Sequence, residues 1–423
     1  MLKILRLCIC SFLVLISTSS HGQATKKKAV FIIVDGVPAD MIEKLNLPNF
    51  DAIKNTGGYS KAIVGGEKGG YSQTPTISAV GYNSILTGTW VNKHNVWGNE
   101  IKEPNYNYTN IFHLLKDQFP RKRIGIFSSW QDNRTKLVGE GMPEAGNIKF
   151  DFKADGLELD TINYPHDENS DYMHRIDEKV ANEASQNILT FAPDLSWVYL
   201  EYTDDMGHKY GDGPEYNKAI SYADEQVGRI WNSVLLREQN YNEDWLIIIT
   251  TDHGRDQATG KGHGGQSDRE RAGWIITNAK NLNSHFKEQK SAMVDIMPTI
   301  ARFMNIKLSV PVAREIDGVP LIGDLSITDP EVEYENGKAK ITWKAIDQTG
   351  MVKIFASPTN NYKTGSEDIY TLLKQVPAKS EKATIDLDNT PSSFYKIVIE
   401  GKWNTVNRWV VADEKNNVSK KIN

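Results

Sequence analysis

Residues 29–36 read Ala-Val-Phe-Ile-Ile-Val-Asp-Gly, an unbroken apolar run that stops at an aspartate and a glycine. Continuous runs rich in Val and Ile are typical of strands that are buried on both faces of a parallel sheet. Asp35 then stands at the carboxyl end of the strand, the edge at which α/β sheets gather their chemistry. This stretch therefore predicts an α/β fold with a functional aspartate at position 35.

The same kind of apolar run recurs along the chain, separated by segments with helical spacing. The further predicted strands are residues 123–127, 195–200, 245–250 and 273–276. The predicted helices are residues 108–118, 171–189, 215–236 and 292–304. Strands that alternate with helices favour a sheet covered by helices on both faces, and we assign this domain to residues 26–322.

From about residue 325 the pattern changes to short alternating segments between turn residues. These segments are residues 338–343, 351–356, 382–387 and 395–400. The pattern indicates an all-β domain over residues 325–423, similar to a fibronectin type III-like sandwich. We expect this domain to be an independent unit, and a contact with a glycan or a protein through it is left open.

The N-terminus has the layout of a cleaved secretory signal. Lys3 and Arg6 precede an apolar run at residues 7–16, which is too short to span a bilayer. We therefore predict a signal peptide over residues 1–22 and a secreted or periplasmic protein. Cys8 and Cys10 both lie in this segment, so the mature chain has no thiol for a disulfide or a zinc site.

The composition excludes two classes of partner. The chain carries 49 basic and 54 acidic residues, for a formal net charge of −5, so it has no broad basic attraction for a nucleic acid polymer. No stretch of the predicted mature chain is long and apolar enough to be an integral membrane segment.

Four short segments concentrate carboxylate and imidazole groups. They supply Asp35, then Asp204 with His208, then Asp252 with His253, and finally His263. These ligand types suit zinc in a chain without cysteine. The spacing of four between Asp204 and His208 can place both on one side of a helical turn. Each segment alone has an ordinary explanation as a turn or a loop, and only the combination points to a metal centre.

In this order, residues 33–36, 76–88, 202–211, 250–254 and 262–265 resemble the motifs of the alkaline phosphatase superfamily, especially its type I phosphodiesterase/nucleotide pyrophosphatase branch. The resemblance covers about residues 28–322 and implies a two-metal phosphoester hydrolase with two Zn²⁺ per chain. It implies one zinc ion on Asp204, His208 and His263. It implies the other on Asp35, Asp252 and His253, with the nucleophile's oxygen completing that site. Asp205 and Asp256 are not assigned as ligands.

The segment 76–88 contains several hydroxyl groups, and the resemblance selects among them. In this superfamily the nucleophile stands ten residues before the glycine of a Thr-Gly pair, which gives Ser78 when counted from Gly88. Ser78 would cap a helix at residues 79–86, where backbone N–H groups favour an anion. The resemblance implies a zinc-activated serine and a phosphoseryl intermediate. Thr76 is the second candidate, and a purely structural N-cap is the alternative role for Ser78.

Two further residues are assigned to the substrate by resemblance. Asn99 stands where relatives place an asparagine that donates to a phosphoryl oxygen, although it is also an ordinary turn residue. Trp130 resembles a tryptophan at a strand end of the phosphodiesterase branch and can offer an aromatic wall, or it can be a core residue.

The sequence constrains the type of ester less than it constrains the type of reaction. A sulfatase is disfavoured, because Ser78 is not followed by the Pro and Arg that sulfatases need. A phosphodiesterase acting on a small-molecule or head-group phosphoester is favoured. The Ala-Val-Gly-Tyr after Ser78 departs from typical nucleotide pyrophosphatases, which leaves the nucleotide open. The alternatives are a phosphomonoesterase, for which Arg134 and Lys136 are the nearest cations, and a non-catalytic extracellular binding protein.

Overall fold

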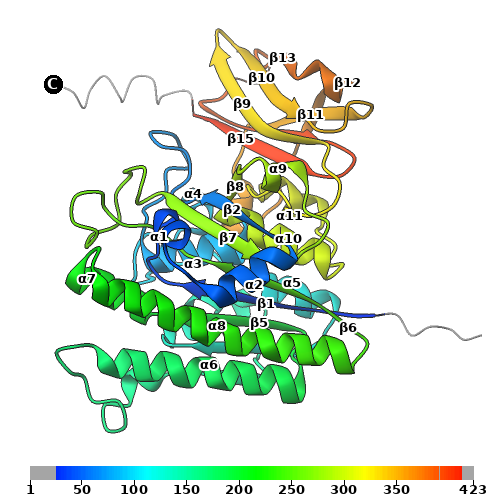
Figure 1. Ribbon diagram of the computed structural model, residues 1–423. Coiled ribbons are helices and arrows are strands. Elements are labelled where there is room, and N and C mark those ends of the chain that lie inside the picture. The colour runs from blue at the N-terminus through cyan, green and yellow to red at the C-terminus, as the bar shows by residue number, and fades with distance from the viewer. Residues whose placement is uncertain (1–24, 390, 412–423) are drawn as a thin grey trace, which may run out of the picture.

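The apolar run at residues 29–34 lies at the centre of the molecule. The structure, a computed structural model, describes residues 25–389 and 391–411, so the predicted signal peptide at residues 1–22 lies outside the described residues. An eight-stranded sheet has the order β4-β3-β5-β1-β6-β7-β2-β8 (Figure 1). Its strands are β1 (Lys26–Val34), β2 (Gly58–Ile63), β3 (Ile124–Ser128), β4 (Phe152–Ala154), β5 (Leu195–Leu200), β6 (Glu243–Thr250), β7 (Ala272–Thr277) and β8 (Ser291–Ala292).

Helices cover both faces of this sheet, as predicted (Figure 1). They are α1 (Ala39–Lys44), α2 (Pro48–Thr56), α3 (Ser78–Thr87), α4 (Val91–His94), α5 (Ile111–Gln118), α6 (Asp171–Phe191), α7 (Tyr202–Tyr210), α8 (Pro214–Asn240), α9 (Ser284–Lys287), α10 (Ile296–Phe303) and α11 (Val310–Glu315). Shorter helical turns are Asn133–Val138, Pro143–Ala145, Leu157–Leu159, Met293–Asp295, Asn361–Thr364 and Ala378–Ser380.

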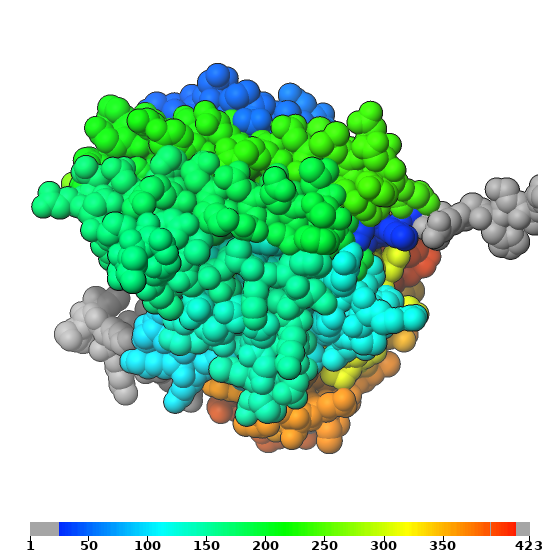
Figure 2. All heavy atoms as spheres, turned by 90° about the horizontal axis from the view of Figure 1, so that it is seen from below, coloured from blue at the N-terminus to red at the C-terminus, as the bar shows by residue number. Residues whose placement is uncertain are grey.

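The unbroken apolar character of residues 29–34 of β1 follows from their position between two helical layers. Val30 and Ile32 pack in the cluster formed with α6 and α8, and these two helices form a broad green part of the surface in Figure 2. Phe31 and Ile33 point to the opposite cluster, formed with α3, α5 and α10. Because successive side chains of a strand alternate between faces, a strand covered twice must be apolar throughout.

One half of the sheet departs from a purely parallel arrangement. β1 is parallel to both β5 and β6, but β7 runs antiparallel to β6 and to β2. The chain between β6 and β7 contains no helix, so it returns along the sheet instead of crossing over to start a parallel strand. The apolar run at residues 273–276 was sufficient to predict the strand but not its direction.

The C-terminal region forms two antiparallel sheets, of order β13-β10-β9 and β12-β11-β14-β15. Their strands are β9 (Ile327–Glu335), β10 (Lys338–Ala345), β11 (Met351–Ser357), β12 (Thr371–Pro377), β13 (Lys382–Asp386), β14 (Phe394–Glu400) and β15 (Thr405–Val411). Both sheets contribute to one buried apolar cluster, which makes the region a sandwich that packs beside the α/β sheet (Figure 1). Among the described residues, no helix is both long enough and apolar enough to cross a membrane.

Candidate metal centre and nucleophile

Three neighbouring strands of the sheet end at the same edge. The last residue of β1 pairs with the last residue of β5, and the last residue of β6 pairs with the next-to-last residue of β1. Asp35 follows β1 directly, Asp252 follows closely after β6, and Asp204 lies in the first turn of α7, just beyond β5. The parallel register therefore brings the three predicted aspartates together.

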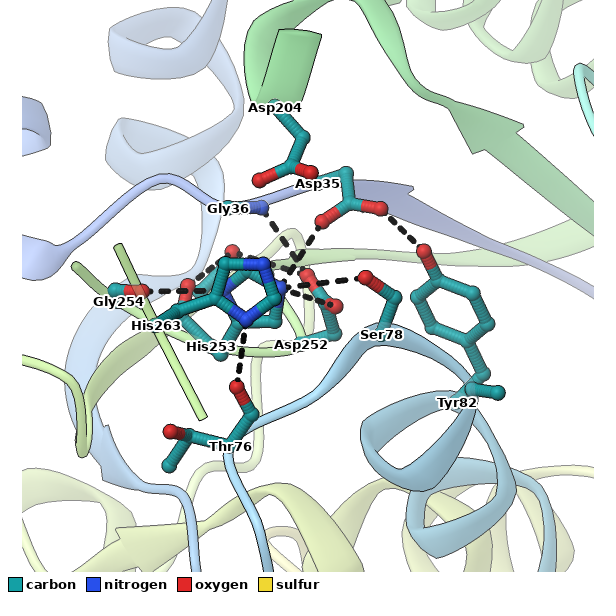
Figure 3. A network of polar contacts seen from close by, with 12 residues as sticks. Asp35, Gly36, Thr76, Ser78, Tyr82, Asp204, Asp252, His253, Gly254 and His263 are labelled. Atoms are coloured by element: carbon teal, nitrogen blue, oxygen red, sulfur yellow. Dashed lines mark hydrogen bonds and ion pairs between the residues drawn. The ribbon is translucent and has the colours of Figure 1, made fainter. Parts of the chain in front are cut away.

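His253 Nε2 is the point on which one half of the site converges (Figure 3). It lies 3.3 Å from Asp35 Oδ1, 3.2 Å from Asp252 Oδ2 and 3.3 Å from Ser78 Oγ. His253 Nδ1 lies 2.9 Å from the carbonyl oxygen of Gly254, to which it donates. This bond makes Nδ1 the protonated nitrogen and leaves the lone pair of Nε2 directed at the oxygens, the arrangement that a metal-binding histidine requires.

The other half of the site adjoins this one through stacked imidazole rings. The rings of His253 and His263 lie 3.7 Å apart with 13° between their planes. His263 Nδ1 donates to the carbonyl oxygen of Thr76 over 2.8 Å, and His263 Nε2 lies 3.0 Å from His208 Nε2. His208 Nε2 in turn lies 3.1 Å from Asp204 Oδ2. The structure thus brings all six predicted ligands together.

Burial dominates the ionisation of the site. It raises the pKa of Asp35 to about 7, with a further contribution from the charge of Asp204, and it raises the pKa of Asp252 well above its usual range. Burial also lowers the pKa of His253, assisted by His263. Burial opposes ionisation of Asp204 as well, but Arg255 together with His208 and the neighbouring histidines holds that pKa below its usual range. The site is therefore a place where negative charge is costly without a cation.

The residues fit a metal site by their unsatisfied oxygens. Asp35 Oδ1 and Asp252 Oδ2 are buried and accept no hydrogen bond. Two sets of ligand atoms lie within 4.8 Å of one another, Asp35 with Asp252 and His253, and Asp204 with His253 and His263. The second set contains His253 where the sequence predicts His208, which lies at its rim beside Asp204. Carboxylate and imidazole groups in this arrangement can hold a divalent cation.

Ser78 is the first helical residue of α3, and the residue that precedes the helix is Ile77. The prediction that Ser78 caps the helix is therefore wrong, because its backbone is already helical and its hydroxyl makes no capping bond. The hydroxyl instead faces His253 (Figure 3). Its position at the start of the helix still places it where backbone N–H groups are not used within the helix.

Thr76, the second candidate, uses its hydroxyl for the fold. Thr76 Oγ1 donates to the carbonyl oxygen of Gly265 over 2.9 Å and accepts from the backbone N–H of Gly264 over 2.9 Å. Its carbonyl oxygen orients His263. Thr76 therefore anchors the loop that carries His263, and the geometry favours Ser78 as the free hydroxyl.

The two residues assigned to the substrate both contact α3. Asn99 Oδ1 accepts from the backbone N–H of Ala79 over 3.0 Å, which places this exposed side chain at the start of the helix. Trp130 is half-buried, and its ring packs edge-on against Tyr82 at 6.3 Å between centroids. Trp130 is thus separated from the ligands by one aromatic ring.

Several residues that orient the ligands were not predicted. The hydroxyls of Tyr82 and Tyr199 both donate to Asp35 Oδ2, the latter over 2.6 Å. The fully buried Arg255 pairs with the carboxylate of Asp204 and donates to its carbonyl oxygen over 2.8 Å. The only available sequence signal was proximity, since Arg255 follows the Asp252-His253 pair and Tyr82 lies one helical turn after Ser78.

Asp256, which the sequence does not assign as a ligand, bonds to the backbone of its own loop. Its carboxylate accepts from the backbone N–H groups of Ala258, Thr259 and Gly262 over 2.9, 2.7 and 2.6 Å. It therefore closes the loop that leads to His263 and has its lone pairs engaged.

Residues 29–270 match the family of type I phosphodiesterases and nucleotide pyrophosphatases. The chain belongs to this family. The matched range begins at β1 and ends just after the His263 loop, so it contains all six predicted ligands and Ser78. Family members hydrolyse phosphoesters, in agreement with the resemblance found in the sequence.

Among curated proteins, this family member is 24% identical over 245 residues to the venom phosphodiesterase CdcPDE of Crotalus durissus collilineatus, covering 54% of this chain and 26% of the relative. It is 23% identical over 245 residues to venom phosphodiesterase 2 of Crotalus adamanteus, covering 54% and 27%. The chain therefore spans about a quarter of the length of these relatives.

Solved structures with related architecture include an inactive variant of a murine ectonucleotide pyrophosphatase / phosphodiesterase 5 in complex with AMP. The TM-score is 0.47 at 13% identity, covering 66% of this chain and 96% of that one. A phosphonoacetate hydrolase from Sinorhizobium meliloti in complex with phosphonoformate gives 0.38 at 18% identity, covering 54% and 57%. These likenesses concern the fold.

Proposed function

We propose that the protein is an exported two-zinc phosphodiesterase that acts through a phosphoseryl intermediate at Ser78. The observation that carries this proposal is the convergence of Ser78 Oγ with the unpartnered oxygens of Asp35 and Asp252 at the lone pair of His253. Membership of a phosphodiesterase family supports it, and so do relatives that are named phosphodiesterases.

In this proposal Asp204, His208 and His263 hold one ion, while Asp35, Asp252, His253 and Ser78 Oγ surround the other. Bound zinc supplies Lewis-acid stabilisation of oxygen anions at neutral pH. Neighbouring residues of the chain orient these ligands. The bonds from His253 to Gly254 and from His263 to Thr76 fix which nitrogen of each ring is free, and the tyrosine hydroxyls hold Asp35 by its other oxygen.

The reaction then takes place in two halves. Ser78 Oγ attacks phosphorus, and the bond from phosphorus to the leaving alcohol breaks as the bond to Oγ forms. Water next attacks the phosphoseryl group, releases the product and restores the Ser78 hydroxyl. Because Asn99 Oδ1 is held by Ala79, its amide Nδ2 is the group that donates to a non-bridging phosphoryl oxygen.

A diester is favoured over a monoester because the nearest predicted cations are engaged elsewhere. Arg134 is paired with Asp155, with Nε 2.6 Å from Oδ2, and also with Glu140. Lys136 Nζ lies 2.7 Å from Asp132 Oδ2. Neither is left to neutralise the second charge of a monoester dianion. Trp130 remains our proposed aromatic wall for a substituent of the diester.

We also propose that residues 1–22 direct export and that the substrate is a small-molecule or head-group phosphoester. N-terminal sequencing of the protein recovered from the medium or periplasm tests the first point. A mature chain that still begins at Met1 would contradict it.

The function is tested by zinc analysis together with the hydrolysis of bis-p-nitrophenyl phosphate and p-nitrophenyl phosphate. We expect about two equivalents of zinc and faster turnover of the diester. Ser78→Ala should lower kcat by about 10³-fold or more with zinc largely retained, because the nucleophile is lost but six ligands remain. Thr76→Val tests the second candidate and should lower kcat far less than Ser78→Ala, because it removes an anchor of the His263 loop and not the nucleophile. A chain without zinc and without turnover of either ester would refute the proposal.

A further inference from the structure

Lys93 is a fully buried cation at the contact between the α/β domain and the C-terminal sandwich. It lies on α4, and its Nζ donates to the carbonyl oxygen of Glu315 over 2.6 Å, to Asp317 Oδ1 over 2.6 Å and to Asn407 Oδ1 over 2.9 Å. Nζ also lies 5.3 Å from the ring of Trp409. All three hydrogens of the ammonium group are used, and two of the groups around it belong to β15 of the sandwich.

Asn407 completes this contact from the sandwich side. It is 2% exposed, accepts from Lys93 through Oδ1 and donates through Nδ2 to the carbonyl oxygen of Ile316 over 2.7 Å. One side chain of β15 thus holds two separate segments of the α/β domain. Buried polar groups are tolerated only when they are satisfied in this way, so neither segment can shift without leaving a buried group unpaired.

The contact extends to α3, the helix that begins at Ser78. Asp317 Oδ2 accepts from the backbone N–H of Trp90 over 2.9 Å, and the backbone N–H of Asp317 donates to the carbonyl oxygen of Gly88, which ends α3, over 2.9 Å. Next along the chain from Lys93, His94 Nε2 lies 3.0 Å from Ser84 Oγ of α3. Residues 88–99 therefore run from the end of α3, through Lys93, back to the start of α3.

The return ends at Asn99, whose Oδ1 is bonded to Ala79 next to the nucleophile. Between Lys93 and Asn99, Val96 donates its backbone N–H to His94 Nδ1 over 3.1 Å. The segment belongs to no strand of the described chain, and its path is fixed by these side chains together with the backbone N–H of Asn105, which donates to the carbonyl oxygen of His94 over 2.9 Å.

A second buried pair reinforces the same surface. Lys396 of β14, 1% exposed, lies 2.6 Å from Glu315 Oε1 and 2.7 Å from Asp368 Oδ2. The ring of Trp409 also stacks on Tyr71, which lies on the segment that leads to Ser78, at 5.7 Å between centroids and 16° between planes. The sandwich therefore touches the chain on both sides of the nucleophile.

We propose that Lys93 and Asn407 are positioning residues, through which the C-terminal sandwich holds residues 88–99 and so sets the amide of Asn99 at the start of α3. The sandwich is then a structural part of the active site and not an independent module. The kinetic consequence rests on the proposed function, whereas the structural consequence does not.

The test uses the full-length zinc-loaded protein and three variants. Asn407→Leu removes both hydrogen bonds at nearly constant size. Asn407→Asp keeps the acceptor for Lys93 but puts an oxygen in place of the donor to Ile316, so it should restore only part of the hold. Asn404→Leu is the matched control, because the side chain of Asn404 bonds to Ser326 and Ile327, away from Lys93.

Hydrogen exchange of the backbone N–H groups of residues 93–96 is the readout that does not depend on activity. In Asn407→Leu we expect exchange at least about tenfold faster there, with β1 unchanged as evidence of an intact fold. Asn404→Leu should resemble the wild type, and Asn407→Asp should lie between the wild type and Asn407→Leu. Equal exchange in Asn407→Leu and the wild type would overturn the proposal, as would equal acceleration in Asn404→Leu.

Kinetics with bis-p-nitrophenyl phosphate supply the second readout. Asn407→Leu should lower kcat by about tenfold to a hundredfold with little change in KM, because the donor is misplaced. In an Asn99→Ala background the same change should alter kcat less than about twofold, and full additivity would overturn the positioning role. If the wild type turns over no phosphoester, the proposed function fails. Even then, faster exchange in Asn407→Leu alone supports the proposal that Asn407 holds residues 88–99. Unchanged exchange in that variant refutes this proposal.

Discussion

Arg255 stabilises the buried carboxylate of Asp204. Its guanidinium group is fully buried, pairs with Asp204 and donates to the carbonyl oxygen of Gly36 over 2.9 Å. Removing one member of a buried ion pair leaves the other without compensation, which costs about 3–5 kcal/mol. We therefore expect Arg255→Met to lower the free energy of unfolding by that amount in the metal-free protein, measured by urea denaturation.

The same measurement with zinc should show a smaller loss, because a bound cation compensates Asp204 in place of Arg255. Arg269→Met is the matched control. Arg269 is also buried, but its partners Asp40 and Asp212 have half-exposed side chains that water can solvate. A loss as large in Arg269→Met as in Arg255→Met would show that burial of the arginine, and not its pairing with Asp204, sets the cost.

Single residues show where sequence reasoning stops. Asp35 and Asp252 were predictable because each follows an apolar run, and the end of a strand can be recognised from the local sequence. Tyr199 was not, because it looks like any apolar residue of β5 until the register with β1 places its hydroxyl 2.6 Å from Asp35 Oδ2. Groups that orient a ligand from a neighbouring strand depend on pairing, which no local pattern contains.

At the scale of elements, α4 is tied to α3 by a histidine that must stay neutral. Burial lowers the pKa of His94 to about 3, and its ring nitrogens bond to Ser84 and to the backbone of Val96. The unfolded chain takes up a proton below about pH 6.5, whereas the folded chain does not until about pH 3. His94 therefore contributes stability that is present above pH 6.5 and lost as the pH falls toward 3.

We expect His94→Gln to be less stable than the wild type at pH 7.5. The difference should shrink by about 2 kcal/mol at pH 5, since 1.5 pH units at about 1.4 kcal/mol each are removed. Urea denaturation at both pH values measures this. Ser84→Ala keeps the histidine and should keep the wild-type pH dependence. Parallel profiles for the wild type and His94→Gln would contradict the assignment.

Elements also divide into those that the sequence predicts well and those that it does not. β5 was predicted residue for residue, because the apolar run 195–200 is bounded by polar residues on both sides. The helix predicted from residue 108 begins at Ile111, because the side chain of Asn110 caps it by accepting from Phe112 and His113. The edge strands β4 and β8 are short and only partly buried, so they lack a pattern long enough to recognise.

For the whole molecule, the sequence indicates two units by a change of pattern near residue 325, and the structure has antiparallel sheets there. The sequence pattern predicts the type of structure in each of the two parts, but the contact between the parts depends on isolated polar residues. Lys93, Glu315 and Asn407 lie far apart in the sequence and carry no motif, yet they form a buried network. The expectation that the sandwich is an independent unit followed from the change of pattern, and the contacts favour the opposite.

A chain that ends at residue 325 tests this at the scale of the molecule. It would lose the acceptor that Asn407 gives to Lys93 and expose Val319 and Leu325, which lie in the core of the sandwich. A buried ammonium group without one of its partners, beside newly exposed apolar surface, predicts a lower melting temperature, faster hydrogen exchange over residues 93–96 and loss of most phosphodiester hydrolysis. A chain that ends at Val411 keeps every contact described here and should match the full-length protein in all three measurements. A melting temperature, an exchange rate and a rate of hydrolysis in the shorter chain equal to those of the control would instead establish the sandwich as an independent domain.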